Sequence, residues 1–469
     1  MKPIFTPPNP SEPVAYVHRW KMLAIMCLAL LITSLDTLIV TVALPTIEAD
    51  LGANISQLQW FVAAYSLAFA APLLFVGGLA DKYGRRLFFI LGMVTLMLGS
   101  VAAALADSPV TMIAARAVMG FGGSMIMPST LALIRHIFPA EERAKAIGIW
   151  VSMGSIGVPF GPIVSGFLLE NFHWGAIFMI NVPLVALAIV GCIALIPETK
   201  SASQSKLDLI GLTLSVVGPL FLVYGIIEAP MRGWVSPVTF GLIGIGLALI
   251  ACFVVWERTT SNPMINRAVF SDRRFGGPLI TIASVFFGIF GGLFIVTQHL
   301  QFTLGYGPLG AGLHMLAMCS VVLVAPISPK LVGRFGLGEV TMFGPLLVAA
   351  GLGFLAFTGS PTNVEVLIAL ALLGFGIGIA APPSVDSIIA STPEDQSGAG
   401  AAVADVAMQL GGALGIAIMG STVTFTSNGK LVALGQSAMT GAVLAVICAV
   451  AVFAVLAGNR GTPTAVAGE

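Results

Sequence analysis

Four ionisable side chains fall within long apolar runs of this sequence: Asp36, Arg116, Asp386 and Asp405. A charged side chain inside hydrocarbon is costly, so each of these residues is a candidate for function. A carboxylate in such surroundings can bind and release a proton, and a nearby cation changes its proton affinity. Proton exchange is therefore the chemistry that these residues indicate.

Asp36 and Arg116 are predicted to lie at similar depths in two helices. A rise of about 1.5 Å per residue places Asp36 roughly 12 Å and Arg116 roughly 8 Å below the outer ends of their helices. At these depths the two side chains can pair, and protonation of Asp36 would dissolve the pair and change which conformation is favoured. A static pair that only fixes helix packing is the alternative.

Asp405 belongs to a polar stripe. Gln409 follows it one helical turn later on the same face, and Gly412 comes next. This pattern predicts a face turned towards the protein interior and not towards lipid. Asp386 is predicted near the inner end of its helix, where contact with water or a capping role is the alternative to a function.

The bulk of the chain requires lipid as its solvent. Of 469 residues, 57% are hydrophobic and 9% are charged, and the mean hydropathy is +1.00, whereas soluble proteins carry about 25% charged residues. The formal net charge is zero, which argues against a basic field for nucleic acid. The sequence holds no cluster of metal ligands, phosphate-binding loop or nucleophile motif, so we expect neither an enzyme nor a bound cofactor or metal.

Crossing the hydrocarbon core takes about 20 apolar residues in a helix. Fourteen segments qualify, near 22–44, 58–80, 88–106, 111–134, 146–169, 176–196, 208–228, 238–256, 276–297, 310–332, 340–358, 364–388, 399–422 and 437–457. Lys and Arg concentrate in alternate connections, whereas the other connections hold only Arg232 and Lys430. Because basic residues mark cytoplasmic loops, we expect an all-α, multi-pass protein of the inner (cytoplasmic) cell membrane with both termini in the cytoplasm.

Two short matches indicate an internal repeat. Leu79–Gly84 (LADKYG) aligns with Leu331–Gly336 (LVGRFG), and 139–144 (PAEERA) aligns with 393–398 (PEDQSG). Two related six-helix halves predict a site at mid-membrane between them. The predicted organisation is a tail at 1–21, a first half at 22–196, two inserted helices at 208–256, a second half at 276–457 and a tail at 458–469.

Longer motifs carry a family resemblance. They are LDTLIVTVALP (35–45), GGLADKYGRR (77–86), RAVMGFGG (116–123), GSIGVPFGPIVSG (154–166) and HWGAIFMINVP (173–183). Together they resemble the major facilitator superfamily and, within it, the multidrug and quaternary-ammonium efflux branch of the fourteen-helix drug:H⁺ antiporter family. The resemblance implies the major facilitator fold, a monomer, and export driven by the proton gradient without a cofactor. It also implies that an acid at the place of Asp405 takes part in cation recognition or proton coupling.

The loop after the second predicted helix carries Gly78, Asp81, Gly84, Arg85 and Arg86. The glycines permit a tight turn, and the charged side chains can pair across the cytoplasmic face. The resemblance implies that Asp81, Arg85 and Arg86 hold the two halves together in the outward-open state. The preference for basic residues on the cytoplasmic side would explain the arginines alone, but not Asp81 or the glycines.

The fifth predicted helix has a stripe without large side chains, formed by Gly154, Gly157, Gly161, Pro162 and Gly166. A neighbouring helix can approach such a stripe closely, and Pro162 is expected to bend the helix. The resemblance implies the helix that distinguishes antiporters from other members. Ordinary packing of small residues is the alternative.

Aromatic and methionine side chains are candidates for lining a substrate cavity, since aromatic faces bind organic cations and methionines adapt to varied shapes. The candidates are Trp60, Tyr65, Trp150, Phe290, Met315 and Met318. Contact with lipid is the alternative for most of them. Relatives that export divalent cations carry an acid in the tenth helix, where this chain has Ser320–Val322, so we expect a monovalent or neutral amphipathic compound.

The combined prediction is a proton-coupled antiporter that exports amphipathic drugs, biocides or dyes by alternating access. A dedicated exporter of one natural product or metabolite, such as an endogenous antibiotic, is the alternative on the same scaffold. A channel or a membrane enzyme is less favoured, because a channel has no need of two repeated halves. The expected partners are a small-molecule substrate, protons and the lipid bilayer, with no nucleic acid.

Overall fold

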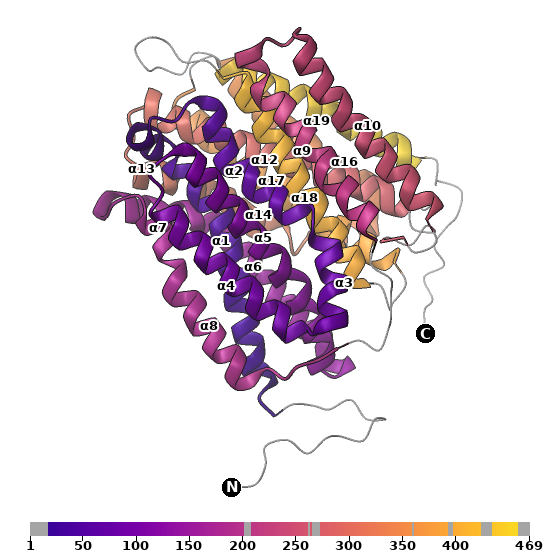
Figure 1. The fold of residues 1–469 in the computed structure, drawn as a ribbon. Coiled ribbons are helices and arrows are strands. Elements are labelled where there is room, and N and C mark those ends of the chain that lie inside the picture. Colours follow the sequence, from indigo (N-terminus) through magenta and orange to yellow (C-terminus); the bar gives the residue numbers. More distant parts are fainter. Residues whose placement is uncertain are drawn as a thin grey trace.

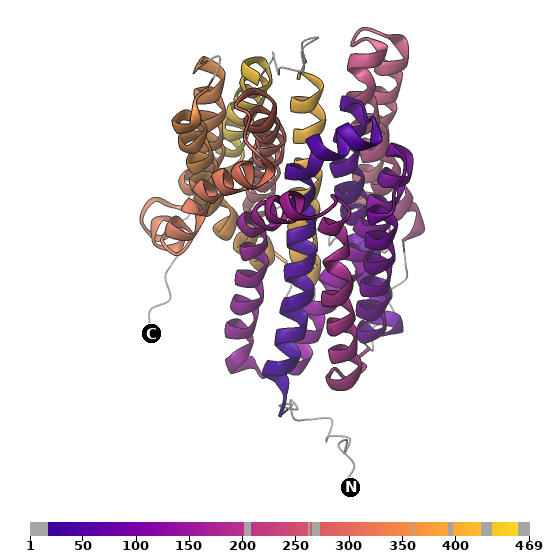
Figure 2. The same cartoon turned by 90° about the vertical axis from the view of Figure 1, so that its left-hand side faces the viewer.

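The computed structural model shows a bundle of long helices (Figures 1 and 2). It describes residues 17–200, 208–260, 263–264, 273–358, 361–392, 397–423 and 434–457. These residues form helices and connections without a β-strand, which confirms the all-α prediction. The end of the bundle that holds Arg19 and Gly84, predicted to be cytoplasmic, is called the inner end, and the opposite end is the outer end.

The N-terminal half contains α1 (Arg19–Leu51), α2 (Ile55–Ala70), α3 (Leu73–Tyr83), α4 (Arg85–Ala104), α5 (Pro109–Ile137), α6 (Ala140–Asn171), α7 (Ala176–Met179) and α8 (Asn181–Leu195). At the outer end, Asn54 caps the first turn of α2 and Ser108 caps that of α5 through their side-chain oxygens. These caps satisfy backbone N–H groups that the helices leave free. Gly52 ends α1 in the left-handed conformation at φ 62°, so the chain turns directly into α2.

The C-terminal half contains α12 (Arg273–Gln298), the π-helical turn η1 (His299–Thr303), α13 (Pro308–His314), the 3₁₀ turn η2 (Met315–Cys319), α14 (Ser320–Val324), α15 (Ser328–Phe335), α16 (Leu337–Thr358), α17 (Asn363–Ala390), α18 (Ser397–Ser421) and α19 (Leu434–Ala457). In this half α12 packs against α18, and α16 packs against α19 and α17. The same relation holds in the N-terminal half, where α1 packs against α6 and α4 packs against α5.

Two inserted helices, α9 (Leu209–Arg232) and α10 (Pro237–Thr259), join the halves. A cluster of small and branched side chains, including Ala63 of α2, Ile227 of α9 and Ala413 of α18, packs together. The Ser56 hydroxyl donates a hydrogen bond of 3.1 Å to the Ile227 carbonyl. Helix α9 therefore covers the line along which α2 of one half meets α18 of the other, while α10 lies on its far side and is largely exposed.

The predicted spans all coincide with helices or broken helices. Within the described residues, eleven helices are long and apolar enough to cross a membrane, and thirteen if each of two bent pairs is one span. The pair α2–α3 bends by 45°, and the helices from Pro308 to Phe335 bend by 51°. Helix α6 occupies the place of the remaining predicted span but is not among the thirteen, so the count of fourteen stays a prediction.

The bends make the internal repeat visible in three dimensions. Each bend lies just before a short helix that runs to the inner end, and each short helix ends at a glycine with positive φ: Gly84 at 138° after α3 and Gly336 at 93° after α15. These glycines are the last residues of the two matching sequences. An L-residue rarely adopts this conformation. The repeat in sequence therefore corresponds to a repeated turn.

A second pair of matching contacts lies in the membrane. A Cβ atom on Gly161 of α6 would lie 3.0 Å from the carbonyl oxygen of Leu35 in α1, and one on Gly415 of α18 would collide with the carbonyl oxygen of Phe287 in α12. Their positions differ between the halves by about the offset of the sequence repeat. Backbone-to-backbone packing through glycine is thus the shared feature of the two halves.

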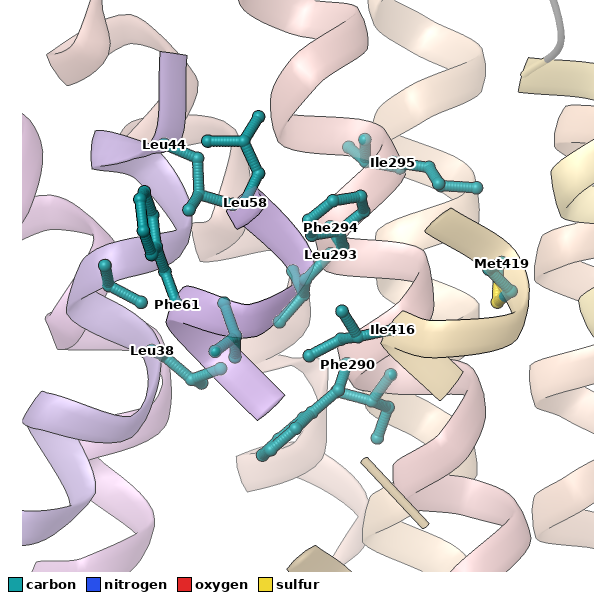
Figure 3. Packing of buried hydrophobic residues seen from close by; sticks show 14 of the residues in the cluster. Leu38, Leu44, Leu58, Phe61, Phe290, Leu293, Phe294, Ile295, Ile416 and Met419 are labelled. Atoms are coloured by element: carbon teal, nitrogen blue, oxygen red, sulfur yellow. The ribbon is translucent and has the colours of Figure 1, made fainter. Parts of the chain in front are cut away.

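The largest hydrophobic cluster contains residues from both halves. Figure 3 shows side chains of α1 and α2 facing those of α12 and α18. The labelled residues are Leu38, Leu44, Leu58 and Phe61 from the first half and Phe290, Leu293, Phe294, Ile295, Ile416 and Met419 from the second. The core of the molecule therefore runs across the interface between the halves.

Candidate functional site

Helices α1 and α5 bring Asp36 and Arg116 together. Arg116 Nη1 lies 2.9 Å from Asp36 Oδ2, and both side chains are fully buried. Arg116 Nε also donates to the carbonyl oxygen of Phe61 at 2.9 Å, while Nη2 is buried without a partner among the described residues. A buried pair of this kind is costly to form and more costly to break from one side only. Neutralising Asp36 therefore changes the free energy of the conformation in which the two side chains are paired.

Asn181 at the start of α8 completes the surroundings of Asp36. Its Nδ2 atom donates to Asp36 Oδ1 and to Ser100 Oγ, each at 3.1 Å. The Arg116 guanidinium carbon lies 4.4 Å from the centre of the Tyr65 ring. The carboxylate is thus held by an arginine on one oxygen and an amide on the other, and the aromatic face stabilises the cation.

Asn181 is a functional candidate that reasoning from charge alone overlooks. It lies inside an apolar run and within the HWGAIFMINVP segment. Burying an uncharged amide in a membrane helix without hydrogen-bond partners also costs free energy. The presence of an asparagine inside an apolar run was therefore the feature of the sequence that could have identified it. Its place beside Asp36 could not be read from the sequence, because α1 and α8 are far apart along the chain.

Asp405 lies in the wall of a pocket where the two halves meet. The pocket is small, and Trp150 of α6 also lines it. The rest of its wall is apolar, formed by Leu73, Met127, Pro128, Leu131, Ala401 and Ala402. Trp150 is only 6% exposed, and its indole N–H has no partner among the described residues. A carboxylate and an indole donor therefore occur together in apolar surroundings.

The other polar candidates lie in different settings. Gln409 follows Asp405 on α18, and its Oε1 atom is buried without a partner among the described residues. Asp386 is exposed near the inner end of α17. Asp386 is therefore open to contact with water in this conformation, as the alternative interpretation expects.

The charged loop at the inner end forms contacts within the N-terminal half. Arg85 Nε donates to Asp81 Oδ1 at 2.7 Å, and Arg86 Nη2 donates to the carbonyl oxygen of Ile193 at 3.0 Å. Gly84 makes the turn, whereas Gly78 lies inside α3, so the expectation of a turn at Gly78 is wrong. Helix α3 continues through Gly77 and Gly78, and the turn comes only at Gly84. A latch between the halves stays a prediction.

Glu198, which follows α8, was not predicted and occupies the centre of this loop. Its carboxylate accepts hydrogen bonds from the backbone N–H groups of Arg86 and Leu87, both at 3.1 Å. It thereby caps the start of α4, where a negative charge is favourable. A Cβ atom on Gly84 would lie 2.7 Å from Glu198 Oε1, so the glycine also provides the space for this carboxylate.

The glycines of α6 face two different partners. Cβ atoms on Gly154, Gly157 and Gly161 would contact α1 at 3.1, 2.5 and 3.0 Å. A Cβ atom on Gly166 would meet the backbone of Leu309 in α13 at 2.6 Å. Helix α6 runs through Pro162 as one helix, so a break there is not observed. The stripe packs α6 against its own half over most of its length and against the other half at the outer end.

Five of the six predicted cavity residues pack elsewhere in this conformation. Tyr65 lies under Arg116, and Trp60 contacts the ring of Tyr224 in α9 with centres 6.0 Å apart. Phe290, Met315 and Met318 are buried in the cluster that spans the halves. Trp150 lines the pocket beside Asp405. A cavity role for the other five stays a prediction.

The halves are closely joined at the outer end. Side-chain to backbone hydrogen bonds connect α2 with α18, η1 with α1, and α6 with α13. They run from Gln59 Nε2 to Ile416 O at 3.3 Å, from Gln301 Nε2 to Val42 O at 2.9 Å, and from Leu309 N to Glu170 Oε1 at 3.3 Å. Together with the packing in Figure 3, they describe a conformation that is closed at this end.

The structure has two repeated helical halves, with a buried ion pair in one half and a carboxylate between the halves. These are features of an alternating-access membrane transporter. Residues 26–416 match the family model described as Major Facilitator Superfamily. This match covers most of the chain, and the chain belongs to that superfamily. It is a multi-pass membrane protein.

Similar curated proteins are named for drug resistance and efflux. Multidrug resistance protein Stp of Mycobacterium tuberculosis (strain CDC 1551 / Oshkosh) is 34% identical over 87% of this chain and 76% of its own length. Multidrug efflux pump LfrA of Mycolicibacterium smegmatis is 34% identical over 89% of this chain and 83% of its own length. The tetracenomycin C resistance and export protein of Streptomyces glaucescens is 31% identical over 86% and 75%.

Solved structures share the fold. A POT family transporter in complex with 5-aminolevulinic acid has a TM-score of 0.68 and 13% identity, covering 93% of this chain and 95% of that chain. The peptide transporter POT in complex with sulfate has a TM-score of 0.69 and 14% identity, covering 94% of each. These likenesses confirm the transporter fold.

Proposed function

We propose that this protein is a proton-coupled antiporter that exports amphipathic drugs or biocides across the cell membrane. The observation that carries the proposal is the fully buried Asp36–Arg116 pair in the membrane-spanning part of the first half. Three similar proteins named for multidrug resistance, multidrug efflux, and resistance and export support the direction and the kind of substrate. Transport needs no cofactor, because the proton gradient supplies the energy.

The ion pair gives the proton a way to act on conformation. Protonation neutralises Asp36 and leaves Arg116 with its bonds to backbone carbonyl groups. The free energy that the pair contributes in one conformation is then lost, and the balance between conformations shifts. Asn181 keeps the carboxylate in position through this cycle. Asp405, which lies between the halves, is the acid that meets the substrate during the cycle.

A dedicated exporter of one natural product is the second candidate. Similar proteins include the tetracenomycin C exporter and a probable actinorhodin transporter of Streptomyces coelicolor. Cells that express the protein separate the two candidates when they are tested with a panel of dyes, biocides and antibiotics. Protection against many unrelated compounds supports the multidrug exporter, whereas protection against one favours the specialist.

The decisive experiment uses the purified protein in liposomes that contain a pH-sensitive dye. A substrate gradient should drive proton movement in the opposite direction, and an imposed pH gradient should concentrate substrate. Substrate movement that leaves the internal pH unchanged would contradict antiport. We further infer a monomer with both termini in the cytoplasm. The orientation is tested by introducing single cysteines at Arg19 and at Arg232 and labelling them from either side of the membrane.

A further inference from the structure

The inserted hairpin of α9 and α10 contacts both halves, and the two contacts differ in kind. Helix α9 packs against α2 of the first half and against α18 of the second. Helix α10 lies at the edge of the bundle (Figure 1) and packs closely on α9, where a Cβ atom on Gly246 would lie 2.5 Å from the backbone nitrogen of Leu222. Alternating access moves one half relative to the other. A hairpin that touches both halves must then stay with one and shift against the other, or separate from both.

Hydrogen bonds fasten α9 to the first half at two levels. Near the outer end, the Ser56 hydroxyl of α2 donates to the Ile227 carbonyl oxygen of α9 at 3.1 Å. Further in, the Ser215 hydroxyl of α9 donates to the carbonyl oxygen of Ala71 at 3.4 Å, and also to that of Leu212 in its own helix at 2.9 Å. Positions 215 and 227 are separated by about 18 Å along a helix. Two bonds this far apart fix both the position and the tilt of α9 against α2.

An aromatic contact lies between these two levels. The rings of Trp60 in α2 and Tyr224 in α9 have centres 6.0 Å apart. Arg232 donates to the Tyr224 hydroxyl at 2.7 Å, and its guanidinium carbon lies 5.3 Å from the centre of the same ring. The tyrosine is therefore held from the side of α9 while it contacts α2. The face of α9 towards the first half has directional contacts along much of its length.

The contact between α9 and α18 is apolar. Ala413 and Ala417 of α18, both fully buried, pack in one cluster with Val223, Ile226 and Ile227 of α9. Further apolar side chains of α18 pack against this cluster, namely Leu410, Leu414 and Ile418. Within the described parts of these two helices, no hydrogen bond or ion pair joins α9 to α18. The face of α18 that meets α9 is thus free of directional contacts.

The two kinds of contact respond differently to displacement inside a membrane. A hydroxyl group that leaves its carbonyl partner in hydrocarbon finds no water to replace it. Apolar contacts are non-directional, and a shifted set of methyl groups or lipid tails replaces them at little cost. The short side chains of Ala413 and Ala417 also leave little to obstruct a sliding helix. A displacement between the halves is therefore taken up where α9 meets α18, and not where it meets α2.

We propose that α9 and α10 move with the first half as one rigid body, while α9 slides over Ala413 and Ala417 of α18. This inference rests on the proposed transport function, because it concerns how the halves move during transport. Ser56 and Ser215 are the residues that fasten the hairpin. The hairpin covers the line between α2 and α18 in each conformation, and so keeps lipid out of this side of the interface throughout the cycle.

Distances between pairs of spin labels on the purified full-length protein in lipid nanodiscs test the proposal. The five native cysteines are first replaced by alanine. Labels are then attached through Val110→Cys in α5, Phe357→Cys in α16 and Val238→Cys in α10, which are 70%, 82% and 52% exposed and lie towards the outer end. The pair at 110 and 357 reports the motion between the halves. Gln59→Leu and a change from neutral to acidic pH are used to produce that motion.

The pair at 238 and 110 should keep its distance distribution when the halves move, whereas the pair at 238 and 357 should shift together with the pair at 110 and 357. A constant distance from 238 to 357 with a shift from 238 to 110 would show that the hairpin follows the second half, and would overturn the proposal. Shifts in both pairs would show a hairpin that moves independently, and would overturn it as well.

Removing the two hydroxyl groups tests the attachment without any motion of the halves. Ser56→Ala combined with Ser215→Ala should broaden the distance distribution between the labels at 238 and 110. Thr213→Ala is the matched control, because Thr213 is an exposed residue of α9 whose hydroxyl bonds to a carbonyl oxygen of its own helix. Equal widths in the double variant and in the control would overturn the role of the two serines.

These measurements separate the inference from the proposed function. A constant distance between the halves under every condition would contradict alternating access, and the double variant would still decide the attachment of the hairpin. Proton-coupled transport in a protein whose hairpin follows the second half would refute the attachment and leave the proposed function intact.

Discussion

Arg116 and Asp36 meet at 2.9 Å with no exposure of either side chain to solvent. The arginine also holds the Phe61 carbonyl oxygen of α2, so one side chain joins α5, α1 and α2. Replacing either charged residue therefore tests both the packing of the first half and its response to protons. The two replacements have different consequences, because Asp36 can be neutralised without loss of shape and Arg116 cannot.

Asp36→Asn should abolish gradient-driven efflux while expression and substrate exchange in the absence of a gradient persist. The amide keeps the size of the carboxylate but binds no proton in the relevant pH range. Transport assays in liposomes, with and without a pH gradient, measure the two activities separately. Unaltered efflux in this variant would remove Asp36 from the coupling mechanism. Arg116→Ala should instead lower stability by about 3–5 kcal/mol, because it leaves a buried carboxylate unpaired.

Asn181→Ala should reduce gradient-driven efflux about tenfold, because Asp36 loses a donor worth about 1.5–3 kcal/mol to a charged acceptor. Asn171→Ala is the control, since Asn171 is exposed and bonds only to the carbonyl oxygen of Phe167 among the contacts described. Initial efflux rates normalised to the amount of folded protein provide the measurement. Equal rates in the two variants would show that the amide is a packing residue.

Gln59→Leu should shift the protein towards conformations that are open at the outer end. The glutamine bonds to the Ile416 carbonyl across the interface, and one such bond is worth about 1 kcal/mol, or roughly a fivefold change in population. Distances between spin labels at the outer ends of α2 and α18 report the change. The exposed Gln436 provides a control as Gln436→Leu. An unchanged distance distribution in Gln59→Leu would exclude the bond as a determinant of closure.

Gly84→Ala should destabilise the inner loop through two separable effects. The backbone conformation of Gly84, at φ 138° and ψ 124°, costs an alanine about 1–3 kcal/mol, and the new Cβ atom collides with Glu198. Combining Gly84→Ala with Glu198→Ala should relieve the collision but not the backbone strain, so the two changes should be less than additive. Thermal unfolding of the purified variants measures this, with Gly148→Ala as control because a Cβ atom there meets nothing within 4 Å. Strict additivity would argue against the contact.

The spans and the ion pair were predictable from sequence for one physical reason. Hydrocarbon penalises charge so strongly that an isolated Asp36 or Arg116 stands out, and a long apolar run can only be a helix. Glu198 could not be identified in this way, because a glutamate in a short polar connection is common. Its function as a cap depends on the fold, which brings the end of α8 to the start of α4.

The lining of the cavity was harder to predict for a related reason. Most spans are apolar on every side, so periodicity does not distinguish a face towards lipid from one towards the core. From the sequence, Trp60 and Met315 were therefore as good candidates for lining the cavity as Trp150. The structure separates them by their neighbours: α9 covers Trp60, and Met315 lies in the core. The bends between α2 and α3 and before α15 could likewise not be predicted from the sequence, because proline is tolerated in membrane helices.

The matching glycine contacts, Gly161 with Leu35 and Gly415 with Phe287, also say something about ancestry. The buried charges of the two halves do not correspond: the ion pair belongs to the first and Asp405 to the second. What both retain is the place where two backbones touch. Duplication thus left a scaffold in which one copy carries a buried ion pair and the other a carboxylate between the halves. In both copies the same close contact between two helix backbones has been kept.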